Sequence, residues 1–180
     1  MQQDSTAGLD DAAFLDFLVG EGLITRTEAQ RAIAASSEAN AAIERTLMEF
    51  GMVAEDPLYR AIAAYLDLPF ISADGIDFER VQDFQLPHEF LLRVEIVPVR
   101  ESPEGVLLAL ADPRAKDALD GVAFHLGANV LPAIAAPGTI KAALQKSAPG
   151  GEPDAGNVSS ADIERLTALA HDGPVIKRVN

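Results

Sequence analysis

Apolar side chains recur every three to four positions through most of the first 67 residues, which is the spacing of amphipathic helices. The pattern occurs twice, because Arg31-Ala32-Ile33-Ala34-Ala35 returns 29 residues later as Arg60-Ala61-Ile62-Ala63-Ala64. At the same shift Gly22 corresponds to Gly51, and a glycine in the left-handed conformation commonly ends a helix. Each copy predicts helix, glycine stop, turn and helix, so we expect residues 10–67 to form two helical hairpins.

Several helix starts in this region carry capping residues. Asp10 or Asp11 can cap the first helix, and Thr25 followed three residues later by Glu28 is a capping-box pattern. Pro57 suits the first turn of a later helix, where its missing N–H costs nothing. The side chains expected on the apolar stripes are Phe14, Leu15, Leu18, Val19, Ala29, Ala32, Ile33, Ile43, Leu47, Phe50, Leu58, Ile62 and either Tyr65 or Leu66.

After Pro69 the helical spacing gives way to short aliphatic runs. Ser102-Pro103-Glu104-Gly105 is a turn-forming cluster between two such runs, which predicts a β-hairpin. The segments expected are strands at 95–99, 106–110 and 130–134, a helix at 114–126 and a helix that follows Pro137-Gly138. The order strand, strand, helix, strand, helix predicts a small sheet with helices packed on it.

Together these segments predict an α+β fold, in which a pair of repeated helical hairpins precedes a small β-β-α-β-α sheet domain. We expect the helical part to span residues 1–69 and the sheet domain residues 70–146. Residues 147–160 are rich in Gly, Pro and Ser, which is typical of a flexible linker. Residues 161–180 begin another helix with nothing left to pack against, so we expect them to start a further region of a longer protein.

The chain is strongly acidic, with a net charge of −14 and a pI near 4.4. Most of its surface therefore repels phosphate backbones and anionic lipids, which argues against nucleic acid as a partner. Residues 1–75 hold 13 acidic and 4 basic side chains, so the acidity concentrates at the N-terminal end. This distribution favours a basic partner surface, and the alternative is a solvated acidic surface that only aids solubility.

The residue types needed for catalysis or metal binding form no recognisable motif. The sequence has no cysteine, and His88, His125 and His171 are each isolated from other ligand types. Neither a GxxxxGKS/T phosphate loop nor a GxSxG nucleophile motif is present. We expect no catalytic residue, no cofactor and no metal site, and we expect this chain not to be an enzyme.

No feature of the sequence predicts export or membrane insertion. The first eleven residues are polar and acidic, without the basic and apolar regions of a secretory signal. No apolar run approaches the length of about 20 residues that spans a bilayer. We therefore expect a cytoplasmic protein that does not insert into the membrane.

A series of short motifs carries a family resemblance. In chain order they are Leu18-Val19-Gly20-Glu21-Gly22-Leu23-Ile24, Ala63-Ala64-Tyr65-Leu66-Asp67-Leu68-Pro69-Phe70, Leu86-Pro87, Val97-Pro98-Val99 and Val106-Leu107-Leu108-Ala109-Leu110-Ala111-Asp112-Pro113. This series resembles the N-terminal domain of type II secretion and type IV pilus assembly ATPases, the general secretory pathway protein E family. The tail, residues 172–180, is similar to the segment where the ATPase region of that family begins.

The resemblance implies a non-catalytic docking and regulatory domain. Such a domain of a type II secretion ATPase binds the cytoplasmic domain of an inner-membrane platform protein and recruits the motor for protein export. The resemblance assigns ATP binding to the parent protein only, with the phosphate loop downstream of this chain. It also implies a hexameric parent, recruited peripherally to the inner membrane, whereas we expect this chain alone to be a monomer or a weak dimer.

The alternative that the resemblance leaves open is a cyclic di-GMP-binding sensor domain of a type IV pilus assembly ATPase. In relatives that bind this dinucleotide, each helical unit opens with Arg-Leu-Gly and closes with Gln. Here the openings read Ala13-Phe14-Leu15 and Ala42-Ile43-Glu44, and the closing positions are Ser36 and Tyr65. The phosphate-facing arginine and the small glycine are both lost, and Glu44 adds repulsion.

Arg31 and Arg60 stand at equivalent positions of the two copies and are the ligand-binding candidates under the sensor alternative. A helix-surface arginine is more often solvated than ligand-binding. For docking, the candidate partner-binding residues are Phe14, Phe17 and Leu18, an apolar group on the first helix. Such a stripe is more often part of the core, and that alternative stays open at this point.

Overall fold

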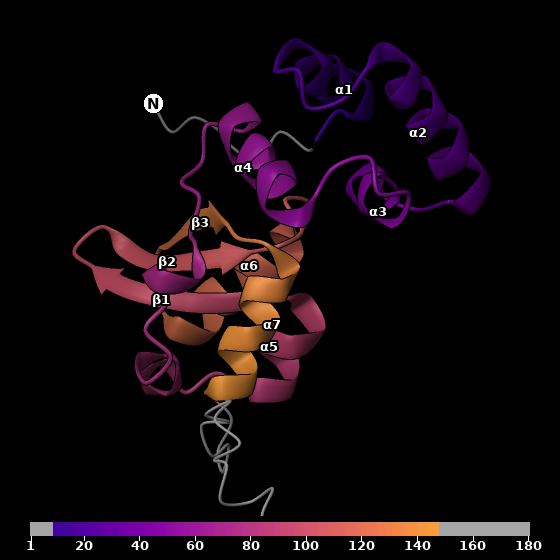
Figure 1. Cartoon of the computed structure of the whole chain (residues 1–180). Coiled ribbons are helices and arrows are strands. Elements are labelled where there is room, and N and C mark those ends of the chain that lie inside the picture. The colour runs from indigo at the N-terminus through magenta and orange to yellow at the C-terminus, as the bar shows by residue number, and fades with distance from the viewer. Residues whose placement is uncertain (1–8, 148–180) are drawn as a thin grey trace, which may run out of the picture. The chain divides into compact units, whose positions relative to one another are not determined.

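The computed structural model describes residues 9–147, and these contain both helices and a small sheet (Figure 1). The helices are α1 (Asp11–Gly20), α2 (Arg26–Ala39), α3 (Ile43–Glu49), α4 (Glu55–Tyr65), α5 (His88–Val94), α6 (Lys116–Leu126) and α7 (Pro137–Lys146). The strands are β1 (Ile96–Ser102), β2 (Gly105–Leu110) and β3 (Val130–Ile134), and short 3-10 turns lie at Ala73–Gly75 and Arg80–Phe84. The predicted α+β class is confirmed. The linker beyond residue 147 and the segment 161–180 lie outside the described residues.

The predicted helix caps are present. The Asp10 side chain accepts hydrogen bonds from the backbone N–H groups of Ala12 and Ala13 at 3.0 and 3.1 Å, so Asp10 is the N-cap of α1. Thr25 and Glu28 form the reciprocal capping box at the start of α2. These contacts satisfy N–H groups that have no partner within their own helix, and they fix where each helix begins.

The two helical units pack against each other through α1 and α4. Phe14, Leu18, Leu47, Leu58 and Ile62 are fully buried within this part of the core. The Phe14 ring meets the Tyr65 ring edge-on, with the ring centroids 5.4 Å apart, which is a favourable aromatic geometry. The duplicated sequence thus forms one packed helical layer.

Two residues predicted on the buried stripes are exposed. Ile33 is 46% exposed, because the face of α2 that packs inward carries the small residues Ala29 and Ala32. Phe50 is 64% exposed, because α3 ends at Glu49 and Phe50 is the C-cap residue beyond it. The sequence prediction therefore extended the apolar face of this helix one residue beyond its actual end.

The sheet has the predicted connectivity, with strand order β1-β2-β3 (Figure 1). β1 and β2 form an antiparallel hairpin, and β3 lies parallel to β2 after the crossover through α6. Several boundaries differ from the sequence prediction, and both hairpin strands extend into the predicted turn, β1 to Ser102 and β2 from Gly105. Glu95 has a φ of 51° and caps α5, so β1 begins one residue later, at Ile96. Arg114 precedes α6, which begins at Lys116.

The helical layer is joined to the sheet by backbone hydrogen bonds. A few residues after α4 ends at Tyr65, the N–H of Ile71 donates to the carbonyl of Ile134 at 2.8 Å, and the N–H of Ile134 donates to the carbonyl of Pro69 at 2.8 Å. Phe70 therefore forms a parallel bridge with Ile134 at the end of β3. The described residues all fall within one compact unit, residues 1–150, and the division into domains at residues 69 and 70 stays a prediction.

Candidate functional site

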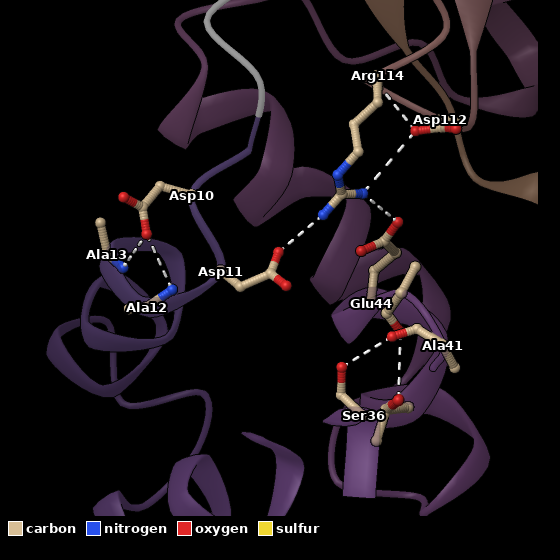
Figure 2. Close-up of polar contacts among 11 residues, drawn as sticks. Asp10, Asp11, Ala12, Ala13, Ser36, Ala41, Glu44, Asp112 and Arg114 are labelled. Atoms are coloured by element: carbon tan, nitrogen blue, oxygen red, sulfur yellow. Dashed lines mark hydrogen bonds and ion pairs between the residues drawn. The ribbon is translucent and has the colours of Figure 1, made fainter. Parts of the chain in front are cut away.

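Arg114 connects the loop after β2 to the helical layer. Its Nη1 donates to Glu44 Oε1 on α3 at 2.7 Å, and its Nη2 donates to Asp11 Oδ1 at the start of α1 at 2.8 Å (Figure 2). The backbone N–H of Arg114 donates to Asp112 Oδ1 at 2.8 Å, and this hydrogen bond holds the loop in position. We call these four side chains the Arg114 cluster. One guanidinium thus binds two helices that are far from it in sequence.

The charges in the Arg114 cluster are partly removed from water. Glu44 is only 6% exposed, and among the described residues nothing donates a hydrogen bond to its buried Oε2. Burial disfavours the charged form of Arg114. The hydrogen bond and charge of Glu44, together with the charges of Asp11 and Asp112, outweigh this effect and raise the pKa of Arg114. The guanidinium of Arg114 therefore keeps its positive charge at any physiological pH.

An open crevice of about 430 Å³ lies beside the cluster. The charged or hydroxyl-bearing residues among those that line it are Glu44, Arg45, Tyr59, Glu95 and Asp112. Burial and then the charge of nearby carboxylates raise the pKa of Tyr59, so its hydroxyl stays protonated and can only donate or accept hydrogen bonds. Within residues 9–147 no group of three or more His, Asp or Glu side chains is placed to hold a metal ion.

A second concave surface, which we call the α1–α4 groove, has a volume of about 340 Å³. Its walls include Phe17, Leu23, Pro57 and Ala64, and its rim carries Glu21 and Arg60. The groove is mostly apolar and open to solvent, whereas the crevice beside the Arg114 cluster is lined by several charged side chains. A surface of this kind can accept an apolar side chain of another molecule.

The structure separates the three predicted docking residues. Phe14 and Leu18 are 0% exposed in the core, so neither side chain reaches the surface. Phe17 is half-buried: its ring lies 5.6 Å from that of Tyr65 and also lines the α1–α4 groove. The assignment of this group to partner binding stays a prediction. Of the three residues, Phe17 is the one whose side chain reaches the surface.

The two predicted ligand-binding arginines lie in different surroundings. Arg60 lines the α1–α4 groove, pairs with Asp56 at 3.5 Å and places its guanidinium 4.4 Å from the centre of the Phe70 ring. Arg31 is exposed on α2 and lines neither of the two concave surfaces. Their assignment to dinucleotide binding stays a prediction.

The sequence alone did not reveal the Arg114 cluster. Glu44 and Arg114 are 70 residues apart and Asp11 is 103 residues from Arg114, so no local spacing connects them. Two other positions of the dinucleotide motif also have internal partners (Figure 2). The N–H of Ala13 donates to Asp10, and the Ser36 hydroxyl donates to the carbonyl of Ala41 at 2.8 Å.

Residues 66–154 match the MshEN domain family. Over 178 residues the sequence is 24% identical to the type IV pilus assembly ATPase PilB of Myxococcus xanthus (strain DK1622). That alignment covers 92% of this chain, and the chain spans 31% of the length of the relative.

Two solved structures share the fold. A structure of MshE with cdg gives a TM-score of 0.64 at 22% identity, covering 75% of this chain and 98% of that one. The N-terminal domain of XpsE gives a TM-score of 0.61 at 23% identity, covering 81% of this chain and 98% of that one.

These matches confirm the class that the sequence motifs predicted: an N-terminal domain of a type II secretion or type IV pilus assembly ATPase. The range that matches the MshEN model begins directly after α4 and includes α5, the three strands, α6 and α7. The helices α1 to α4 of the helical layer all lie before the matched range, because α4 ends at Tyr65.

Proposed function

We propose that this chain is a non-catalytic docking and regulatory domain. It binds the cytoplasmic domain of an inner-membrane platform protein of type II secretion, and so recruits the parent ATPase from the cytoplasm to the membrane. The observation that carries the proposal is the α1–α4 groove, an open apolar surface on a strongly acidic helical layer. Docking needs such a surface and no reactive group.

Two further observations are in keeping with this role. The two shortest ion pairs of the described residues, those of Arg114 with Asp11 and Glu44, connect the loop after β2 to two helices rather than surround a reacting group. Within residues 9–147, no helix has both the length and the hydropathy needed to cross a bilayer. A chain of this kind would reach the membrane through a protein partner.

Isothermal titration calorimetry tests the proposal directly. The chain is titrated with the purified cytoplasmic domain of the platform protein from the same organism and, separately, with cyclic di-GMP. We expect heat of binding with the protein and none with the dinucleotide. Absence of binding to the platform domain, with both proteins shown to be folded by circular dichroism, would contradict the docking function.

A cyclic di-GMP sensor is the second candidate, and the fold shared with the structure of MshE with cdg favours it. The chemistry of the repeat opposes it, because Glu44 is a buried anion where the motif has glycine, and Ala13 carries no charge for a phosphate. If the titration detects the dinucleotide, replacing Arg31 and Arg60 together by alanine should abolish that binding under this alternative.

A further inference from the structure

The α1–α4 groove owes its depth to small side chains on one face of α4. Ala61 and Ala64 are three residues apart and both line the groove. Opposite them, Phe17 of α1 is turned toward Tyr65 and leaves part of its ring at the groove wall. Alanine methyl groups fill little space, so the volume of about 340 Å³ is large enough for a leucine- or phenylalanine-sized side chain.

The uncompensated charge at the rim of the groove is negative, and this is the charge that an incoming partner would meet. Arg60 is the basic residue on the rim, but its charge is already engaged by Asp56 and by the Phe70 ring. Glu21 stands on the rim one helical turn after Phe17, and no described residue forms an ion pair with it. Residues 1–75 as a whole carry 13 acidic and only 4 basic side chains.

We propose that the groove receives an apolar side chain from a basic amphipathic helix of the partner protein. This inference rests on the proposed docking function and names its surface and the chemistry of its partner. A helix is favoured because apolar and basic residues three or four positions apart lie on one helix face. The apolar residue enters between Phe17 and Ala64, and the basic residue reaches Glu21.

The substitution Ala64→Arg tests this assignment, because it fills the groove with a long basic side chain. Ala64 is exposed on α4, so the variant should fold and melt like the wild type. The matched control is Ala34→Arg, an exposed alanine on α2 away from the groove. We expect Ala64→Arg to weaken binding of the platform cytoplasmic domain at least tenfold, and Ala34→Arg to leave it within twofold.

The outcomes separate the two levels of the proposal. If the wild type and both variants bind equally, the groove assignment is overturned while the docking function stands. If the folded wild type does not bind, the docking function itself fails and the groove assignment fails with it. If sedimentation velocity shows that Ala64→Arg instead abolishes self-association, the occupant is a second copy of this chain and the partner assignment is overturned.

A charge substitution tests the basic character of the partner. Glu21→Lys reverses the rim charge without filling the groove, and we expect it to weaken binding at least fivefold at low ionic strength. The control Glu38→Lys makes the same change at an exposed position on α2. Equal affinity of both variants would overturn the basic-helix assignment, because repulsion at the rim would then be unimportant.

Discussion

Arg114 concentrates more long-range polar contacts than any other described residue, and its removal has a defined cost. In the variant Arg114→Ala, the nearly buried carboxylate of Glu44 loses the only hydrogen-bond donor that the described residues give it. We expect the free energy of unfolding to fall by about 3 kcal/mol, the lower end for breaking a buried pair, since Arg114 itself is partly exposed. Urea denaturation measures the change.

Arg45→Ala is the matched control for this experiment. Arg45 is exposed beside the same crevice, and no ion pair or hydrogen bond of the described residues involves its side chain. We expect a change within about 0.5 kcal/mol. Equal destabilisation by the two substitutions would show that the Arg114 cluster contributes little more than a general charge effect.

Gly105 is a second position where one residue determines local structure. Its φ is 145°, and a Cβ atom there would lie 2.5 Å from the carbonyl oxygen of Asn129. We expect Gly105→Ala to reduce the free energy of unfolding by about 2 kcal/mol or more, because it adds strain and a backbone clash. The control is Gly121→Ala in the middle of α6, where a Cβ atom would meet no other atom within 4 Å. Thermal or urea denaturation should show this variant to be as stable as the wild type or more stable by about 0.5–1 kcal/mol.

At the scale of elements, the capping box of α2 makes the stability of that helix depend on pH. Hydrogen bonds from the Thr25 backbone and then from its side chain lower the pKa of Glu28 below the ordinary 4.5. Because the pKa of Glu28 is lower in the folded state than in the unfolded state, ionised Glu28 stabilises the fold at any pH above the unfolded-state pKa. This stabilisation is lost as the pH falls through the folded-state pKa.

The variant Glu28→Gln tests this dependence. At pH 7 it should be less stable than the wild type, since a neutral amide accepts the same hydrogen bonds more weakly than a carboxylate. Near pH 2.5 the difference should be smaller, because the wild-type carboxyl is protonated to a greater extent there than at pH 7. Urea midpoints at the two pH values measure it, and a constant difference would contradict the role of the charge.

Elements with complete local signals were predicted well from the sequence. The start of α2 at Thr25 and Glu28 and the hairpin turn at Ser102 to Gly105 are examples, because each depends on neighbouring residues. Phe50 was misplaced because spacing alone does not show that a helix is only seven residues long. The α1–α4 groove was not foreseen as a surface, although Phe17 and Arg60 were named, because it forms only when two helices pack.

At the scale of the whole molecule, the net charge of −14 should make docking sensitive to salt. Raising NaCl from 0.1 to 1 M shortens the screening length from about 10 to about 3 Å. We expect the affinity for the platform cytoplasmic domain to fall roughly tenfold, mainly through a slower association rate. Surface plasmon resonance at both salt concentrations checks this, and an unchanged association rate would show that charge does not steer the encounter.

The parallel bridge between Phe70 and Ile134 has a mechanical consequence. Under the proposed docking, a partner held in the groove would pull on α4, which ends only four residues before Pro69, where the segment hydrogen-bonded to the end of β3 begins. The two bonds flanking Phe70, each 2.8 Å long, connect parallel segments and are slanted to the strand direction, so a pull along the chain loads both in shear at once. Tension would therefore pass into the sheet and α7 before the helical layer peeled away.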